Sequence, residues 1–525
     1  MGKIKSAIIT AIIALATLAL FLFGVISCAL PGGVNRYNSI LASINLGAEL
    51  SGDAYSVLLP EGVISAEEYD FTVAEEGEEA DDMKQSYTQA PGGSFYVENT
   101  LLNSFASDGT ADTADERALA FEELSQKIAA DADIVAARLS GRNLTSYSVG
   151  VLGGYALRVA VPTNFSYAAY SGNDTGARSE YITTAGTTIS HLSLGGELTL
   201  RNNEYGVRDR VSAAQNAAGT TETRNILGAT LRVEDIFQSV TYYAMGGTYA
   251  VRINLTEQGV EEISRVSAYI ADTSTTSDQT IRFYVGETSV IDLTCESQIT
   301  GRSFYIQCST EDLARDYAAL LNSAATGNSL EYVYEYNDIV YQTTPGGENT
   351  AMFLAIAALA VLAVIIVAAV VRYRGLGATF ALMSLLFAGA MIAIVYLVGV
   401  TLTTMGVFMA VMCYMLFAGC NFWSFEQIRR ESDAGRTIQA AVKTGYKKTF
   451  TGILDMHIVL LVVSVLLTLI CGGELAACGM IMLIGTLASY LLHWFTRFSW
   501  YVTMSLARDK YKFCGFSREA FDEDE

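Results

Sequence analysis

The sequence has few charged residues and few histidines for its length. Only 17% of its 525 residues are charged, and three are histidines. It has no Gly-rich phosphate loop followed by Lys-Ser/Thr, no nucleophile elbow and no Cys-x-x-Cys pair. These absences predict a protein that is not an enzyme, does not hydrolyse ATP and needs neither a cofactor nor a metal ion.

Positive charge is scarce between residues 31 and 350. This segment has 44 Asp and Glu against 18 Lys and Arg, whereas the rest of the chain has 11 acidic and 15 basic residues. A domain with so large an acidic excess repels the phosphates of DNA and RNA. The charge balance therefore argues against a nucleic-acid partner.

Long apolar runs are abundant and are confined to the two ends of the chain. A helix needs about 20 apolar residues to cross the hydrocarbon layer of a membrane. Such runs lie near residues 7–28, 351–371, 376–398, 405–424, 451–471 and 475–497. The sequence predicts six membrane helices, one before and five after a large domain.

The basic residues of the short connections predict the orientation of these helices, because such residues prefer the cytoplasmic side. They all fall on one side of the predicted topology: Lys3, Lys5, Arg372, Arg374, Arg429, Arg430, Arg436, Lys443, Lys447 and Lys448. The connections on the other side, 399–404 and 472–474, carry only Glu474. We expect a multi-pass plasma-membrane protein with both termini in the cytoplasm and residues 31–350 outside.

The domain between the membrane helices alternates strand-like and helix-like patterns. Strands are predicted at 43–59 (a pair around a Gly turn), 144–162 (a hairpin), 247–255 and 281–294, and helices at 115–140, 256–270 and 309–325. Thr256 and either Ser309 or Thr310 are candidate caps. The order suggests α+β packing on a ferredoxin-like base. We interpret the acidic segment 61–115 as a solvated, mobile insertion and the polar head region 163–230 as strands or irregular chain.

Three cysteines leave alternatives open. Cys295 and Cys308 flank the segment 300–303 in what looks like a hairpin, where a disulfide is possible outside the cytoplasm, but two free thiols fit equally well. The segment ending at Cys28 resembles a lipoprotein cleavage site. We favour an uncleaved first helix, because its apolar run is long enough to span.

Several segments resemble one family, the SecD subunit of the bacterial protein-export machinery. FEQIRRESDAGRTIQAAVKTGYKKTFTGILD at 425–455 is the most specific: it resembles the SecD loop between membrane helices four and five, with Phe425, Glu426, Ile428 and Arg429 at motif positions. The stretch 399–421 resembles the SecD fourth helix. LGAELSGD at 46–53 and the stretch 298–325 resemble the two ends of the SecD outer domain.

This resemblance implies a fold, partners and a role. The fold would be a six-helix half of a resistance-nodulation-division transporter with an α+β outer domain. The partners would be a SecF-like second half, the Sec protein-conducting channel, exported unfolded polypeptides and membrane lipid. The role would be to couple ion flow to late steps of protein export. The expected boundaries are 1–30, 31–350, 351–500 with a cytoplasmic loop at 425–450, and a cytoplasmic tail at 501–525.

The candidate ion-coupling residues are Asp455, Asn421, His457 and His493. Asp455 matches an acidic residue of the family, and an ionisable side chain within a span is costly and usually functional. The family Asp in the fourth helix is replaced by Gly419, which cannot carry a proton, while the neighbouring Asn421 is kept. His457 and His493 are possible substitutes, although neutral histidines bonded to neighbouring helices are the simpler interpretation. His457 lies about 200° round the helix from Asp455, so the two cannot face one partner.

Two other functions compete with an ion-driven export subunit. Gly419 favours a non-transporting scaffold or holdase that kept the fold and lost ion coupling. A subunit of a small-molecule or lipid exporter has less support, because the segments outside the membrane resemble SecD.

Overall fold

We analysed a computed structural model of the full chain, in which most residues are described. The described residues are 3–29, 36–74, 78–106, 109–111, 113–144, 146–163, 175–202, 224–225, 232–272, 278–336, 338–342, 349–471, 473–504, 506–507 and 510–514. Most of 203–231 and the end of the tail, 515–525, lie outside this set, as does the side chain of Cys28.

The chain divides into two compact units. One, here called the membrane unit, comprises Met1–Asp53, Pro162–Tyr181 and Gln342–Glu525. The other, called the α+β unit, comprises Ala54–Val161 and Ile182–Tyr341. Each unit has its own hydrophobic core.

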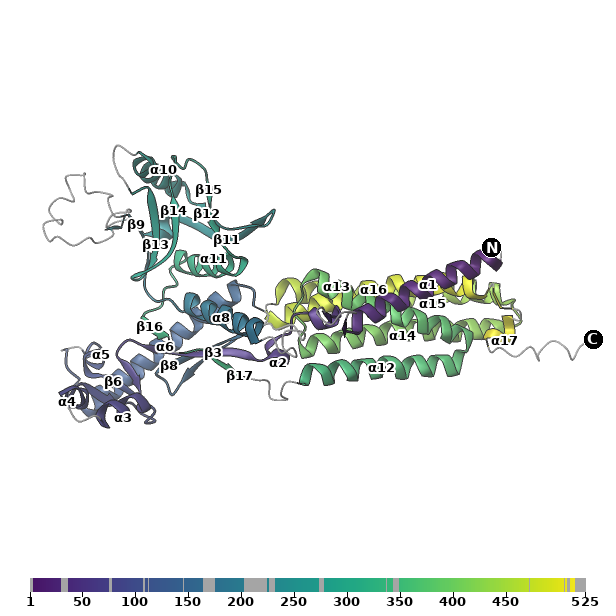
Figure 1. Cartoon of the computed structure of the whole chain (residues 1–525), viewed down its shortest axis with the longest axis horizontal. Coiled ribbons are helices and arrows are strands. Elements are labelled where there is room, and N and C mark those ends of the chain that lie inside the picture. Colours follow the sequence, from purple (N-terminus) through teal and green to yellow (C-terminus); the bar gives the residue numbers. More distant parts are fainter. Residues whose placement is uncertain are drawn as a thin grey trace, which may run out of the picture. The chain divides into compact units, whose positions relative to one another are not determined.

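Six helices of the membrane unit are long and apolar enough to cross a membrane, as the sequence predicts. They are α1 (Lys3–Val25), α12 (Thr350–Tyr373), α13 (Gly375–Val398), α14 (Thr404–Asp433), α15 (Ile438–Ile470) and α16 (Gly473–Met504). Figure 1 shows them running alongside one another. Together with the sheet-containing unit they confirm the predicted fold class.

Short elements complete the membrane unit: β1 (Cys28–Ala29), β2 (Arg36–Tyr37), the 3-10 helix η1 (Leu41–Ser43), α2 (Ala48–Ser51) and α17 (Lys510–Cys514). The prediction of two strands over 43–59 is half wrong, because α2 precedes the single strand β3 (Asp53–Pro60). Gly52, with φ +89°, ends α2, so the glycine stops a helix rather than turning a hairpin.

The α+β unit contains several small sheets among its described residues. A five-stranded sheet has the order β16 (Tyr334–Tyr336), β3, β8 (Ala156–Pro162), β7 (Ser148–Leu152), with β17 (Val340–Gln342) also on β3. A four-stranded sheet has the order β10 (Arg224–Asn225), β9 (Leu198–Asn202), β13 (Thr280–Val285), β14 (Thr288–Thr294). A three-stranded sheet has the order β11 (Phe237–Met245), β12 (Thr248–Leu255), β15 (Ser303–Cys308).

The helices of this unit form largely where the 3.6-residue periodicity predicts them: α6 (Ala114–Gly141), α10 (Glu257–Ala271) and α11 (Glu311–Ala325), with the short α9 (Val233–Ile236) between β10 and β11. Thr256 caps α10 by accepting a bond from the Gly259 amide, and Thr310 caps α11 by accepting one from the Leu313 amide. Both caps were predicted from the hydroxyl residues before these helices.

Two segments are more ordered than predicted. Residues 61–115 are not a solvated insertion, because α3 (Ala66–Ala74), α4 (Glu78–Ser86) and α5 (Asn99–Asn103) join a sheet of β4 (Val63–Ser65), β6 (Phe95–Glu98) and β5 (Tyr87–Gln89). Val97 and Leu102 there are buried. The head region contains the helix α8 (Thr175–Leu192), whose Ile189 and Leu192 are also buried. Sparse apolar residues suffice here because they join the core of the whole unit.

The hairpin that would place Cys295 opposite Cys308 is not formed. β15 pairs with β12, where Cys308 lies opposite Tyr249, whereas β14, just before Cys295, pairs with β13. Both cysteines are free thiols. Burial raises the pKa of Cys295 to about 11, so this thiol is unreactive at neutral pH.

A buried ion pair ties three helices of the α+β unit together. Arg142, directly after α6, bonds the carboxylate of Asp316 on α11, which also accepts a bond of 3.1 Å from the Thr188 hydroxyl on α8. Asp316 is 1% exposed. His191 Nδ1 lies 3.5 Å from the same carboxylate, so the one histidine of this unit belongs to the cluster.

Replacing Arg142 is expected to destabilise the α+β unit strongly. Arg142→Met leaves a buried carboxylate without its charge partner, which costs about 3–5 kcal/mol. Hydrogen exchange of the α11 amides in the full-length protein measures this loss. Arg265→Met, which breaks an exposed pair with Glu262 (2.7 Å), is the control and costs about 1 kcal/mol or less. Equal exchange in the two variants would contradict the assignment.

Candidate functional site

The SecD-like segment is helical almost throughout and is not a loop. α14 continues to Asp433 and α15 begins at Ile438, so only residues 434–437 connect them. The predicted loop over 425–450 is therefore wrong. Phe425 and Ile428 are fully buried between the helices, while Arg429 is exposed.

Two glutamates hold this helical hairpin at its basic end. Glu426 accepts bonds from Arg372 on α12 (2.7 Å) and from the Tyr373 hydroxyl (2.9 Å). Glu431 is 5% exposed and pairs with Lys448 (2.5 Å) and Arg436 (3.2 Å). Glu426 joins α14 to α12, and Glu431 joins α14 to α15. Glu426, the acidic residue of the SecD-like motif, therefore has a structural partner on a neighbouring helix.

Small residues let α14 and α15 approach closely. The Ser424 and Thr449 hydroxyls lie 3.1 Å apart. A Cβ on Gly445 would come within 3.0 Å of the Ile428 amide nitrogen, and one on Gly452 within 2.5 Å of the Trp423 ring. The two helices run in opposite directions, so these contacts place Gly419 level with residues 455 and 456.

Asp455 lies on the surface of the membrane unit, next to open space. Its side chain is exposed and has no hydrogen-bond or ion-pair partner among the described residues. It follows Lys448 by about 10 Å along the helix, which puts it inside the apolar span. A Cβ on Gly419 would meet no atom within 4 Å. Asp455 and Gly419, the position where the resemblance expected a second acid, are therefore both exposed and lie at similar levels along the hairpin.

His457, two residues further, lies on the opposite, buried face, as the helical geometry predicts. Its Nδ1 is 2.7 Å from the Ile453 carbonyl and its Nε2 is 3.0 Å from the Ser489 hydroxyl on α16. A carbonyl only accepts, so Nδ1 carries a proton. The neutral ring then accepts a bond from Ser489 at Nε2.

Asn421 and His493 are fully buried beside this histidine. Asn421 donates from Nδ2 to the Phe417 carbonyl (2.8 Å), but its Oδ1 has no partner among the described residues. The same holds for Nδ1 of His493, whose ring lies 5.3 Å from that of Tyr446. The four candidate residues thus fall into two groups, with Asp455 outside the bundle and the other three inside.

Sequence reasoning named His493 but missed the other polar residues that lie around it. Ser489, His493 and Thr496 lie on one face of α16, with Tyr446 and Thr449 opposite them on α15, and all five are buried. The signal was available in the spacing, since three- and four-residue steps place side chains on one helix face. In a strongly apolar helix such a row marks a face turned to other helices.

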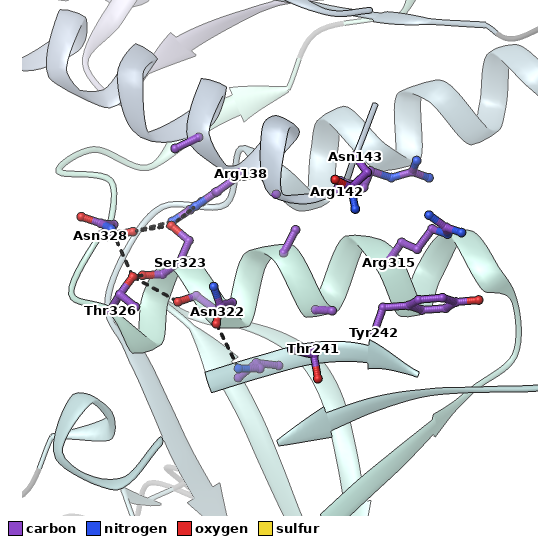
Figure 2. A pocket seen from close by; sticks show the side chains of 15 residues that line it. Arg138, Arg142, Asn143, Thr241, Tyr242, Arg315, Asn322, Ser323, Thr326 and Asn328 are labelled. Atoms are coloured by element: carbon purple, nitrogen blue, oxygen red, sulfur yellow. Dashed lines mark hydrogen bonds between the residues drawn. The ribbon is translucent and has the colours of Figure 1, made fainter. Parts of the chain in front are cut away.

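The α+β unit has a separate polar pocket of about 500 Å³ between α6, α11 and β11. Figure 2 shows Tyr242 and Arg315 at one end, and Arg138 with Asn322, Ser323, Thr326 and Asn328 at the other. Arg315 pairs with Glu311 (2.7 Å) and stacks over the Tyr242 ring at 4.6 Å. Sequence reasoning did not identify this pocket.

The arginines of this pocket are held by the protein itself. Burial would lower the pKa of Arg142, but the carboxylates of Asp316 and Asp312 outweigh it and raise that pKa. Within the described part of the chain Arg138 forms no ion pair, and burial lowers its pKa to about 10 although the charge of Asp131 acts in the opposite direction. It donates to the carbonyls of Leu194 (2.7 Å) and Asn328 (3.2 Å). Arg138 therefore joins the segment just before β9 to the segment just after α11.

Comparison with known proteins was made at the level of sequence and of fold. No protein-family model matches the chain. The chain is 26% identical over 267 residues to the protein translocase subunit SecD of Aquifex aeolicus, covering 49% of this chain and 48% of that protein. It is 33% identical over 134 residues to SecD of Anaeromyxobacter dehalogenans, covering 26% of this chain and 22% of that protein.

The fold agrees with that similarity. A crystal structure of SecDF in a super-membrane-facing form matches 96% of this chain and 58% of its own, with a TM-score of 0.55 and 15% identity. The chain is similar in sequence to SecD proteins and in fold to SecDF. It spans about half the length of the Aquifex SecD that it matches.

For a SecD relative, the glycine at 419 is the main departure at the site. The open space around it means that packing does not require a glycine there. Among the described residues no group of three or more His, Cys, Asp or Glu could hold a metal ion.

Alanine substitutions at two glycines are expected to separate packing from chemistry. Gly445→Ala drives a methyl group into Ile428 and costs about 1–3 kcal/mol. Gly419→Ala meets open space and leaves stability unchanged or up to about 1 kcal/mol higher, because alanine favours helix. Thermal unfolding followed by tryptophan fluorescence reports on the membrane unit, which holds all three tryptophans. A larger loss at Gly419 would refute the packing of this hairpin.

Proposed function

We propose that this chain is a SecD-like accessory subunit of the protein-export translocase, which assists late translocation or release of secreted chains. In this proposal both termini are cytoplasmic and residues 31–350 are extracytoplasmic. The support is the family relationship together with the basic residues gathered at one end of the membrane helices.

The exposed carboxylate of Asp455 is the observation that supports ion coupling and a second half. A charged side chain facing lipid within a span is costly. The surface of α14 and α15 around Asp455 is therefore suited to a protein partner and not to lipid. A SecF-like six-helix chain is the partner of matching architecture, and its side chains would complete an ion path along this face.

A non-transporting scaffold or holdase is the competing function. Gly419 supports it, because the glycine removes one of the two acids that the family resemblance expects on this face. The two functions differ in what Asp455 does, so they separate in one experiment.

Asp455→Asn is expected to abolish ion-driven stimulation of export. The measurement is translocation of a secreted protein into inverted membrane vesicles, with and without an ion gradient, in the presence of the Sec channel and a SecF-like partner. Loss of a proton-carrying group lowers the stimulated rate on the order of a hundredfold. Asp433→Asn, at the exposed cytoplasmic end of α14, is the control and leaves the rate unchanged. Unchanged stimulation in Asp455→Asn, with gradient-independent binding of export substrates, would favour the holdase.

The α+β unit offers a place for an unfolded chain. β11 is an edge strand of its sheet, and Thr241 and Tyr242 on it line the pocket. The Val240 N–H of this strand already donates to Asn322 Oδ1 (3.0 Å), so the edge beyond Val240 is the part left for pairing. An edge strand pairs with an extended polypeptide through main-chain hydrogen bonds and is indifferent to most of its sequence. Such contact suits a subunit that handles many secreted proteins.

A photo-cross-linking residue at Thr241 is expected to capture an exported chain arrested in transit. The matched control is the same residue at Thr288, which is also exposed on an edge strand, β14, but lies away from the pocket. Cross-links at least several times stronger at 241 are expected. Equal capture at both positions would remove β11 from the proposal.

A further inference from the structure

The first half of α12 lies beside a cavity instead of packing tightly against other helices. One side of it carries apolar residues at three- and four-residue steps: Ala351, Ala355, Ala358 and Leu362. This spacing is typical of a helix face that packs against protein. Leu362 is buried, whereas the three alanines are only half-buried. All four residues line a cavity of about 350 Å³ inside the membrane unit, here called the α12 cavity.

Three other segments of the membrane unit complete the walls of the α12 cavity. Side chains come from α13 between residues 387 and 395, from α14 between residues 407 and 414, and from the segment between residues 25 and 50. Alanines on the facing helices, Ala388 and Ala410, leave space that larger side chains would fill. The cavity is partly open, and α12 lies at an edge of the bundle (Figure 1). A molecule can therefore enter from beside the bundle.

The lining of the α12 cavity is almost entirely hydrocarbon. Among the described residues that line it, none is charged. The hydroxyls of Ser27 and Ser39 lie 3.3 Å apart and bond each other, and the Tyr414 hydroxyl bonds Ser384 (3.2 Å). A water molecule held in a cavity needs about two to four polar partners. The lining therefore favours an apolar occupant over water.

The dimensions of the α12 cavity match a lipid chain and not a helix. From Ala351 to Leu362 the helix rises about 16 Å, which is roughly half of a hydrocarbon layer about 30 Å thick. Over that length, 350 Å³ corresponds to a cross-section of about 20 Å². An extended hydrocarbon chain fits this width, whereas a helix about 10 Å across occupies about 80 Å². A helix of a partner or of a second copy is too wide.

We propose that the α12 cavity binds one acyl chain of a membrane phospholipid. The headgroup lies at the end of the cavity with Ser27 and Ser39, where α1 ends and α12 begins, and the chain runs toward Leu362 and Tyr414. The bound chain supplies the packing that the first half of α12 lacks. This site goes beyond the export function and does not depend on Asp455.

A photoactivatable phospholipid tests the site in the full-length protein. The protein is reconstituted in phosphatidylglycerol vesicles that contain a small fraction of the same lipid with a diazirine in the middle of one acyl chain. Met391 and Tyr414 line the cavity and are at most 5% exposed, so bulk lipid does not reach them. After illumination, mass spectrometry of peptides is expected to find the label on these two residues. Label confined to exposed residues such as Phe353 and Val364 would overturn the proposal.

Two variants that fill the cavity make the test specific. Ala358→Phe fills it from α12 and Ala410→Leu from α14, so each is expected to lower the labelling of Met391 several-fold, because the added side chain occupies the space of the lipid chain. Ala357→Phe, on the exposed side of α12, is the control and leaves the labelling of Met391 unchanged. Tryptophan fluorescence verifies that each variant is folded.

The outcomes separate the possible occupants. Equal labelling of Met391 in the control and in both filled variants would overturn the proposal. So would a wild-type chain that takes no label at Met391 and Tyr414 while the filled variants change its association with another protein chain, because the cavity would then hold protein. No measurement involves export, so a failure of the export role would not affect these results.

Discussion

Polar side chains inside a membrane bundle have to find partners on neighbouring helices, because lipid supplies none. In this chain the constraint falls on α14, α15 and α16. Ser424 meets Thr449, His457 meets Ser489, and Gly445 and Gly452 bring the backbones close enough for these contacts. The helix pair with the SecD-like sequence is therefore held by short polar contacts as well as by apolar packing.

The same helix pair presents two faces with different chemistry. The buried face carries uncharged polar groups and histidine, whereas the exposed face carries one carboxylate beside a glycine. In the function that we propose, the exposed Asp455 lies on the surface that a second half would cover. The loss of the acid at 419 weakens that face, while the histidines concentrate titratable groups on the other face, within one half.

Local patterns in the sequence were sufficient for much of the fold. Apolar length predicted the six spans, and hydroxyl caps predicted where α10 and α11 begin, because both depend on neighbouring residues alone. Pairing between distant segments could not be predicted. β15 lies beside β12 and not β14, so the expected hairpin is absent, and of the two alternatives for Cys295 and Cys308 the structure has the free thiols. The sequence of residues 61–115 predicts an insertion, because its few apolar residues find a core only in the folded unit.

The same distinction applies to the candidate site: geometry within one helix could be predicted, whereas packing between helices could not. The rotation of 100° per residue separated Asp455 from His457 correctly. Ser489, the partner of His457, was not predicted. Which residues of α15 and α16 lie opposite each other depends on how the two helices pack, and the sequence of either helix alone does not give it. Ser489 is one polar residue among many in the sequence and becomes informative only through its position.

The four-residue turn at 434–437 has a mechanical consequence. Glu431 is bound to Lys448 and Arg436, and Ile438, Ala441 and Val442 beside the turn are buried, so the hairpin is a rigid part of the bundle up to its turn. From Asp455 to the turn is about 27 Å of helix. A rocking of the pair by ten degrees at the depth of Asp455 would sweep the tip by roughly 5 Å. Whatever engages that turn would sense, or impose, the tilt of the helix that bears the carboxylate.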